Sequence, residues 1–357
     1  MPDPERVRLV VLFGGQSAEH EVSCISALHV LRAVDPDRYD IEAIGITREG
    51  TWVRADDAIA ALHAGTTRQL EAVGTSVAPL PAVTPRLGDE LPLVVLPLLH
   101  GTRGEDGTVQ GMLELANVPF VGSGVLGSAL CMDKLKAKDV LASHGLPQVP
   151  WIGLRDTEIV DVVALAAAAG LRYPLFVKPA NLGSSVGVSR AVDEAALVSS
   201  ASLAAAYDEW IVVEESALGR EIEVAVLGNA HPRASVPGEI IPAGDFYDYE
   251  DKYVADAAEL VIPADLPDDV TEEIRNLAVL AFTTLRCDGM ARVDFFYEAD
   301  GRGLLLNEVN TIPGFTPISM YPNLWAASGL PYDQLIDELV ALALERHERR
   351  QRFSIER

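Results

Sequence analysis

Apolar residues in the N-terminal part of the chain fall into short continuous runs that end at glycines. Residues 7–13 form such a run before Gly14-Gly15, and residues 93–99 form another before His100-Gly101. Uninterrupted apolar runs of this length are typical of strands buried on both faces of a parallel sheet. Residues 39–47 predict a further strand, and the apolar spacing of three within residues 23–34 predicts a helix.

The rest of the chain alternates between helical and extended patterns. Helices are predicted over residues 108–116, 133–144, 161–169 and 268–286 and at the C-terminus, and strands over residues 173–178, 210–214, 289–297 and 304–309. Strict alternation in residues 221–227 predicts an antiparallel strand with one covered face. Residues 54–92 lack a clear period and predict a peripheral insertion. Residues 243–257 form a polar aromatic loop, and the charged residues 345–357 predict a frayed end.

These patterns predict an α/β protein, with α+β character in the C-terminal half. The chain has 357 residues, more than one ordinary hydrophobic core accommodates. The pattern changes near residue 130, and Pro147 and Pro150 mark a linker soon afterwards. We therefore predict three domains, over residues 1–130, 131–220 and 221–357.

Charge limits the classes of partner. The formal net charge is −25, from 53 acidic and 28 basic residues. A nucleic acid or an anionic membrane needs a basic surface on the protein, so this balance argues against both. A nucleotide remains compatible, since it needs only a few local cations and backbone N–H groups. Most of the charge is explained by solubility alone.

The cysteines and the apolar segments indicate a compartment. Cys24, Cys131 and Cys287 are odd in number and lack CxxC spacing, which predicts reduced core residues rather than a disulfide or zinc set. The N-terminus lacks the apolar run of a signal peptide, and no apolar stretch approaches membrane-spanning length. We expect a soluble, cytoplasmic protein.

Acidic and amide side chains alternate along two neighbouring predicted strands. Period two puts Arg292 and Asp294 on one face of the first strand, and Glu308 and Asn310 on one face of the second. The short glycine-containing turn between them predicts a hairpin, so the two polar faces should be adjacent. Hard oxygen ligands beside an arginine suit Mg²⁺ that is shared with phosphate oxygens.

The competing interpretation of this cluster is a solvated sheet face with ordinary charges. Each carboxylate taken singly favours that interpretation. The alternate positions, however, are apolar, and they indicate strands that are bound into a core: Val293, Phe295, Leu304 and Leu306. The combined set therefore favours a metal site.

A glycine- and serine-rich segment follows the strand at residues 173–178. It contains Gly183, Ser184, Ser185 and Gly187. Glycines allow backbone N–H groups to converge on an anion, and serine hydroxyls can add hydrogen bonds to phosphate. Lys178 and Lys134 could supply positive charge. The segment matches neither GxxxxGK[ST] nor GxGxxG, and such a loop alone is usually only a turn.

Paired glutamates close the strand at residues 210–214. Glu214-Glu215 lies where a strand meets a linker, so it could hold adenine and ribose, but a helix cap or a rim charge is an equal alternative. Ribose binding and plain exposure compete in the same way for Glu221.

Read together, these segments resemble the D-alanine–D-alanine ligase family, of the ATP-grasp superfamily, over nearly the whole chain; residues 54–92 match poorly. The matching motifs are Gly14–Ser23, Leu99-His100-Gly101 with Gly104–Thr108, Met132-Asp133-Lys134, Lys178-Pro179 with Gly183–Gly187, Asp245–Tyr253, and Asn307–Thr316 with Ser319. Several separated motifs in the right order are more specific than any one of them. The resemblance implies an ATP-grasp fold with an N-terminal Rossmann-like domain.

The resemblance also implies roles for individual residues. The implied ATP contacts are Lys134, Lys178, Gly183, Ser184, Ser185, Glu214, Glu215, Glu221 and Lys252. Asp294, Glu308 and Asn310 would bind Mg²⁺ or Mn²⁺, and Arg292 with the N–H of Gly314 would form an oxyanion site.

Substrate contacts follow from the same resemblance. Glu19 would hold the ammonium group of the first D-alanine, with His100 near its carboxylate, and Ser319 with Met320 would hold the second D-alanine. Ser184 and Tyr253 would join Glu19 in a hydrogen-bonded triad that closes a loop over the site. Asn181-Leu182 departs from the family, in which an acidic residue is common, and we expect it to tune loop closure.

The implied reaction is the ATP-dependent joining of two D-alanine molecules through a D-alanyl phosphate, for peptidoglycan synthesis, by a homodimer. Tyr253 favours an amine nucleophile over D-lactate. One alternative is another ATP-grasp ligase, of the biotin carboxylase-like or peptide-extending kind, which would not need Glu19 or Tyr253. The other is a non-catalytic nucleotide-binding or scaffold protein, which would tolerate loss of the metal-site residues.

Overall fold

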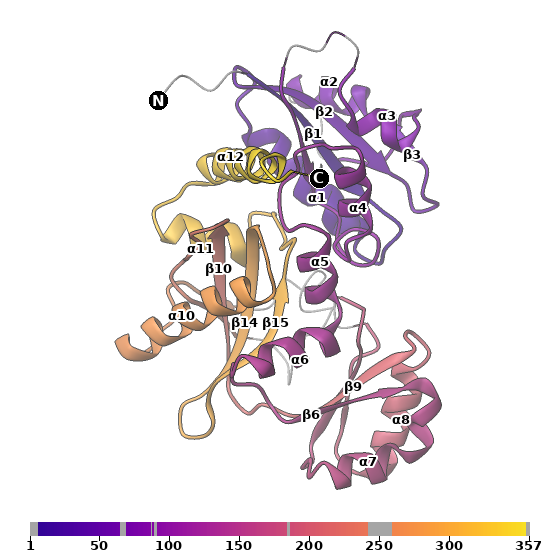
Figure 1. The fold of residues 1–357 in the computed structure, drawn as a ribbon, viewed down its shortest axis with the longest axis vertical. Helices are drawn as coiled ribbons and strands as arrows, with labels where there is room; N and C mark the ends of the chain where they lie inside the picture. Colours follow the sequence, from indigo (N-terminus) through magenta and orange to yellow (C-terminus); the bar gives the residue numbers. More distant parts are fainter. Residues whose placement is uncertain are drawn as a thin grey trace.

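The computed structural model describes residues 6–64, 69–86, 88, 91–183, 186–241 and 259–354. Within them the chain forms three sheets, which follow one another along the long axis of the molecule (Figure 1). The N-terminal sheet lies at one end of the molecule, and the sheet formed within residues 151–215 lies at the other. The latter is called the central sheet because it is central in the sequence. The C-terminal sheet lies between these two in space. The mixed α/β class predicted from the sequence is confirmed.

The N-terminal sheet has strand order β4-β3-β2-β1-β5. Its strands are β1 (Val7–Gly14), β2 (Tyr39–Ile46), β3 (Trp52–Arg54), β4 (Thr75–Ser76) and β5 (Leu93–Pro97). β1 lies parallel to both β2 and β5, and all of its residues are buried. The helices of this part are α1 (His20–Ala33), α2 (Asp56–His63), α3 (Pro79–Val83) and α4 (Thr108–Leu115). The predicted buried parallel strands are confirmed.

The segment over residues 54–92 is more than an insertion. Its strand β4 pairs antiparallel with β3, so the segment adds an edge strand to the sheet. Its described part also contributes buried side chains to the core, among them Leu70, Ala72, Ala82 and Val83. The prediction of a peripheral segment is therefore wrong in this respect, because short strands and isolated apolar residues leave no readable period.

The central sheet is antiparallel, with order β6-β9-β7-β8. It comprises β6 (Trp151–Arg155), β7 (Leu175–Pro179), β8 (Ser189–Ala191) and β9 (Trp210–Glu215), with the 3₁₀ helix η1 (Asp156–Asp161) and the helices α7 (Val162–Ala168) and α8 (Glu194–Ala204). The sequence predicted β7, β9 and α7 but not β6, β8 or α8. Two helices, α5 (Val125–Met132) and α6 (Lys134–Ser143), connect the N-terminal part to this sheet.

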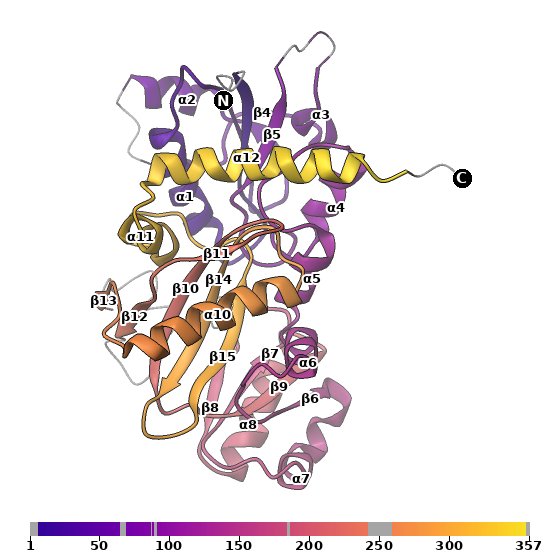
Figure 2. The same ribbon diagram turned by 60° about the vertical axis from the view of Figure 1, so that its left-hand side comes forward.

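The C-terminal sheet has order β13-β12-β10-β14-β15, with β11 paired to β10. Its strands are β10 (Arg220–Gly228), β11 (Arg233–Ala234), β12 (Gly238–Ile241), β13 (Glu259–Val261), β14 (Gly289–Glu298) and β15 (Gly303–Asn310). The helix α10 (Asp268–Thr284) covers one face, and α11 (Met320–Ala327) and α12 (Tyr332–Gln351) follow β15 (Figure 2). The loop predicted over residues 243–257 lies outside the described residues.

Both faces of β10 are covered, so the prediction of a single covered face is wrong. Ile222 and Val224 pack in one core cluster with Phe282 of α10. Ala225 and Leu227 pack in another, with side chains of α11 and α12. The alternation in the sequence marks different neighbours on the two faces rather than a core face and a solvent face.

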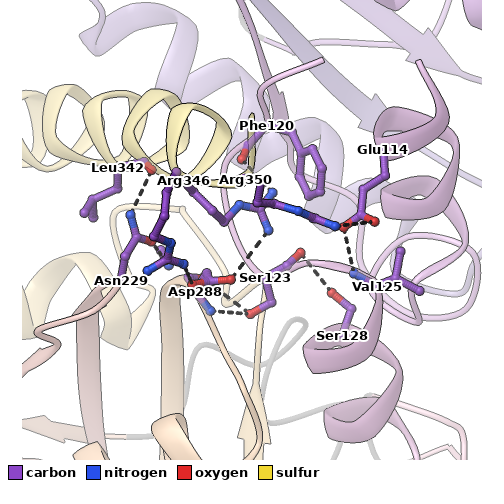
Figure 3. A network of polar contacts seen from close by, with 12 residues as sticks. Glu114, Phe120, Ser123, Val125, Ser128, Asn229, Asp288, Leu342, Arg346 and Arg350 are labelled. Atoms are coloured by element: carbon purple, nitrogen blue, oxygen red, sulfur yellow. Dashed lines mark hydrogen bonds and ion pairs between the residues drawn. The ribbon is translucent and has the colours of Figure 1, made fainter. Parts of the chain in front are cut away.

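The end of the chain is also more ordered than predicted. α12 continues to Gln351, so residues 345–351 of the charged stretch form its last turns. The structure describes this stretch as far as Ser354. Arg346 is only 3% exposed, and its guanidinium lies 4.1 Å from the ring centroid of Phe120. Arg350 forms an ion pair with Glu114 of α4, as Figure 3 shows. α12 is thus anchored against the N-terminal part by side chains that are distant in sequence.

The cysteine prediction is confirmed: Cys24, Cys131 and Cys287 are free and buried. Cys131 and Cys287 are neighbours, with 3.5 Å between their sulfur atoms, which their spacing in the sequence does not indicate. Across the described part of the chain, no helix combines the length and apolar character that crossing a membrane requires.

Candidate active site

A cavity of about 680 Å³ lies where the three parts of the chain meet. The sequence-predicted residues that line it are Glu19, His100, Lys134, Gly183, Arg292, Glu308, Asn310, Gly314, Ser319 and Met320. They come from α1, α6, β14, β15, the start of α11 and the loops beside them. Residues from near both ends of the sequence, such as Glu19 and Met320, therefore line the same cavity.

The predicted hairpin of polar residues is confirmed. β14 pairs antiparallel with β15, so that Arg292 lies opposite Asn310 and Asp294 lies opposite Glu308. The register shifts between Asp294 and Phe295, immediately beyond these pairs. The apolar residues on the other face, including Val293 and Val309, pack in the core with α10. The sheet thus presents Arg292, Glu308 and Asn310 to the cavity, whereas Asp294 lies outside the lining and is bonded to Arg292 and Asn310.

Direct bonds join three of these polar groups. Arg292 Nε and Nη2 donate to the two oxygens of Asp294, at 2.8 and 2.7 Å. Asn310 Nδ2 also donates to Asp294 Oδ2, at 2.9 Å. Although burial opposes the charged guanidinium, the carboxylates around Arg292 raise its pKa. Arg292 is therefore a permanent cation at this end of the cavity.

The residues present fit a magnesium ion that is shared with a nucleotide. Because the amide nitrogen of Asn310 faces Asp294, its oxygen is directed away from that bond. Mg²⁺ typically takes one or two carboxylates and completes its shell with phosphate oxygens and water. Among the described residues there is no group of three or more His, Cys, Asp or Glu side chains that could hold a metal alone. Two carboxylates and an amide match the shared arrangement better than a site built of protein ligands only.

Lys134 connects the polar hairpin of β14 and β15 to the glycine-rich segment. Its Nζ donates to the carbonyl oxygen of Leu182 at 2.7 Å and lies 3.5 Å from Glu308 Oε2. The lysine is placed at the start of α6, where Asp133 caps the helix by accepting from the N–H of Lys136. A phosphate next to Gly183 would therefore meet a cation that is already positioned.

A buried group of three charges lies behind the cavity wall. Glu214 Oε1 is 2.5 Å from Lys178 Nζ, and Glu214 Oε2 is 2.9 Å from Lys138 Nζ. Burial raises the pKa of Glu214, but the two lysines together lower it to about 2. Burial lowers the pKa of Lys138. Burial also opposes the charge on Lys178, but the carboxylates around it, Glu214 first and then Glu308, raise its pKa. Lys138 was missed in the sequence, although its spacing of four from Lys134 places both on one helix face.

Of the predicted contacts Glu215 and Glu221, the first faces away from this group, whereas the second lies near enough to Lys178 for its negative charge to raise the pKa of that lysine. The side chain of Glu215 points to the opposite face of β9 from Glu214, and it pairs with Arg172 at 3.2 Å and Arg302 at 3.3 Å. Glu221 lies at the start of β10, opposite Phe296 in the register. The structure does not bring either side chain to the cavity lining.

His100 is buried in the cavity wall. Its Nδ1 donates to the carbonyl oxygen of Ile312 at 3.0 Å, since a carbonyl only accepts. Burial lowers its pKa, against the opposing charge of Glu19. Its Nε2 is buried and has no hydrogen-bond partner among the residues that the structure describes. A substrate carboxylate at Nε2 would stabilise the imidazolium and satisfy this nitrogen.

Glu19 lies where two glycine segments converge. A Cβ added at Gly101 would be 3.2 Å from Glu19 Oε2, and one added at Gly183 would be 3.1 Å from the same atom. Larger residues at either position would crowd the carboxylate. The structure therefore brings Glu19 beside the glycine-rich segment, as the resemblance implied.

The segment before α11 is tightly folded around Ser319. Its Oγ accepts from the backbone N–H of Thr316 at 3.0 Å, and Thr316 Oγ1 lies 2.8 Å away. A Cβ at Gly314 would be only 2.7 Å from Ser319 Oγ, so this close approach requires glycine. Met320 follows as the first residue of α11.

Glu105 is a site residue to which sequence reasoning assigned no role, although its motif was singled out. It lines the cavity and accepts from the backbone N–H of Gly101 at 2.7 Å. Burial raises its pKa to about 8, reinforced by the negative charge of Glu19. The signal in the sequence was its position between the turn glycines Gly104 and Gly107.

Glu105→Gln is expected to reduce the pH dependence of stability. The folded protein retains a proton on Glu105 that the unfolded chain releases near pH 4.5. Its contribution to the free energy of unfolding is therefore complete below pH 4.5 and is lost as the pH rises through about 8. Melting temperatures at pH 5, 6.5 and 8 should fall less steeply in the variant. Parallel profiles for the two proteins would contradict the assignment.

Four predicted site residues, Ser184, Ser185, Lys252 and Tyr253, lie outside the described residues, so their roles remain predictions. Glu223 was also missed. It belongs to the cavity lining and forms an ion pair with Arg292. Its signal was the period-two spacing from Glu221 on the same strand.

Known proteins match this chain over nearly its full length. The family models described as the D-ala D-ala ligase N-terminus and C-terminus match residues 8–123 and 140–341. A D-alanine–D-alanine ligase of Shouchella clausii is 48% identical over 96% of this chain and 96% of its own. One of Ruminiclostridium cellulolyticum is 46% identical over the same shares.

Two solved structures are also similar to this chain over nearly its full length. The D-alanine–D-alanine ligase of Coxiella burnetii has a TM-score of 0.82 at 39% identity, covering 97% of this chain and 96% of its own. The VanG D-Ala:D-Ser ligase of Enterococcus faecalis has a TM-score of 0.82 at 34% identity, covering 95% and 100%. The ATP-grasp fold implied by the resemblance is confirmed. The chain belongs to the D-alanine–D-alanine ligase family.

Proposed function

We propose that this enzyme joins two D-alanine molecules into D-alanyl-D-alanine, with conversion of ATP to ADP and phosphate, for peptidoglycan synthesis. The observation that carries the proposal is the single cavity in which the polar hairpin of Arg292, Glu308 and Asn310 faces Glu19 and Ser319. One side suits a nucleotide phosphate and its cation, and the other offers groups for an ammonium and a carboxylate.

The first chemical task is activation of a carboxylate, whose leaving group would otherwise be oxide. The carboxylate oxygen of the first D-alanine attacks the γ-phosphorus of ATP, the bond to the bridging oxygen breaks, and ADP leaves. Lys134 and Lys178 are proposed to offset phosphate charge. Mg²⁺ or Mn²⁺, held by Asp294, Glu308 and Asn310, would neutralise charge on the transferred phosphoryl group.

The second task is attack by the amine of the second D-alanine on the acyl phosphate. A tetrahedral oxyanion forms, and phosphate leaves as the amide is made. Arg292 and the N–H of Gly314 are proposed to stabilise that oxyanion, and loss of one such donor typically costs about 10²–10³ in rate. Exclusion of water would protect the acyl phosphate from hydrolysis.

Glu19 is proposed to hold the ammonium group of the first substrate and His100 its carboxylate. Ser319 and Met320 would hold the second substrate. Glu214, Glu215 and Glu221 are proposed nucleotide contacts together with Gly183, although the side chain of Glu215 is engaged by arginines. We further propose that the enzyme is a cytoplasmic homodimer, with the domain division predicted from the sequence.

Product analysis tests this function directly. Phosphate release should depend on ATP and D-alanine and should be absent with L-alanine. With D-alanine, D-serine and D-lactate supplied together, we expect D-alanyl-D-alanine as the main product by mass spectrometry. A mainly depsipeptide product would overturn the proposed amine acceptor, and D-alanyl-D-serine as the main product would reassign it.

A further inference from the structure

Arg292 is held between carboxylates from two strands. Asp294, on its own strand, accepts from Nε and Nη2. Glu223, on the neighbouring strand β10, places Oε2 3.0 Å from Nε. The register sets Glu223 directly opposite Asp294, so the two carboxylates flank the guanidinium across the pair of strands.

Asp294 and Glu223 have different expected roles in the reaction. Asp294 is a proposed metal ligand, and its oxygens already accept from Arg292 and Asn310. Binding a cation would compete for those lone pairs, so part of the contact with Arg292 would weaken. Glu223 is outside the proposed metal set, and its side chain is 7% exposed in the cavity wall. Its contact with Arg292 would survive cation binding.

We propose that Glu223 is a positioning residue for Arg292, which keeps the guanidinium directed at the reacting carbonyl while Asp294 serves the metal. This inference rests on the proposed function. Stabilisation of an oxyanion depends on a donor being in place before charge develops, so a loosened guanidinium should slow the chemical step more than binding. The predicted signature is a change in kcat with little change in KM.

Glu223→Gln is the test variant. Gln preserves volume but removes the negative charge 3.0 Å from Nε, whose single N–H is donated to Asp294. Asp294 still pairs with Arg292 in the free enzyme, so folding should persist. We expect kcat for ATP-dependent phosphate release to fall about 10- to 100-fold, part of the loss typical of a missing oxyanion donor. The KM values for ATP and D-alanine should stay within about twofold.

Glu239→Gln is the matched control. Glu239 lies on β12 in the same sheet and pairs with Arg220 at 2.7 and 2.6 Å, but neither residue lines the cavity. Both variants lose one glutamate–arginine pair of the C-terminal sheet. Only Glu223→Gln should lose kcat, and melting temperatures should confirm that both are folded.

Three results would overturn the positioning role. The first is an unchanged kcat in folded Glu223→Gln, and the second is an equal loss of kcat in Glu239→Gln. The third is a loss that higher Mg²⁺ concentration restores, because Glu223 would then act through the metal. Arg292→Lys separates this inference from the proposed function. If Arg292→Lys retains full kcat, the oxyanion role fails; if it loses kcat while Glu223→Gln does not, only the present inference fails.

Discussion

Asp294→Asn is expected to lower kcat by roughly 10³-fold while leaving the fold intact. The change removes the charge expected to bind the metal and also weakens the bidentate contact with Arg292. Asn keeps the side-chain volume, and the neighbouring Val293 and Phe295 keep β14 in the core. Steady-state phosphate release and thermal unfolding measure the two parts of the prediction.

Asp300→Asn provides the control, because Asp300 lies exposed in the turn between β14 and β15. It should turn over substrate at the wild-type rate. Wild-type turnover by Asp294→Asn would exclude a magnesium role for Asp294. A large drop in melting temperature would instead show that its contact with Arg292 is mainly structural.

Glu214→Gln is expected to destabilise the protein by about 3–5 kcal/mol, because it leaves Lys138 and Lys178 buried without their shared counterion. Urea unfolding without nucleotide measures this cost. The low pKa of Glu214, about 2, means that its contribution is complete above pH 4.5 and is lost as the pH falls toward 2. The difference between the two proteins should therefore shrink in acid.

Lys138→Met is the counterpart. It removes one of the two cations and leaves Glu214 paired with Lys178, so the remaining charges balance. A long apolar side chain fills the same buried site, and the expected change is within about 1 kcal/mol. A cost equal to that of Glu214→Gln would show that the three charges act as one indivisible unit.

The polar hairpin of β14 and β15 could be predicted from the sequence because it depends on local geometry, while its role as a metal site stays a prediction. Period two fixes which residues of β14 share a face, and a short turn makes β14 and β15 neighbours. The register confirms that the two polar faces are adjacent, and it sets Arg292 opposite Asn310 and Asp294 opposite Glu308. The apolar runs of β1 and β5 likewise predicted strands that are buried on both faces.

Features that depend on distant segments escaped prediction. Glu223 reaches Arg292 only because β10 pairs with β14, and no local pattern in the sequence predicts that pairing. Arg346 appeared in a charged terminal stretch, yet Phe120 and Asp288 bury it. β8 has only three residues, too few to show a period. α8 did carry a local signal, since Asp193 caps it by accepting from the N–H of Ala196.

The position of α12 has a consequence for how the cavity exchanges its contents. Asp337 of this helix pairs with Arg38 and accepts from Tyr39 in the N-terminal part, while Glu338, one residue later, pairs with Arg233 in the C-terminal sheet.

α12 therefore joins the N-terminal part to the C-terminal sheet, and separating the two would break several ion pairs at once. Among the described residues no ion pair joins the four-stranded central sheet to α12. Its side-chain contacts with the C-terminal sheet include the Glu215–Arg302 ion pair and a hydrogen bond from Lys178 to Asn307 at 3.4 Å. We expect substrates to enter and dipeptide to leave by a swing of the central sheet, while the framework on either side of α12 stays fixed.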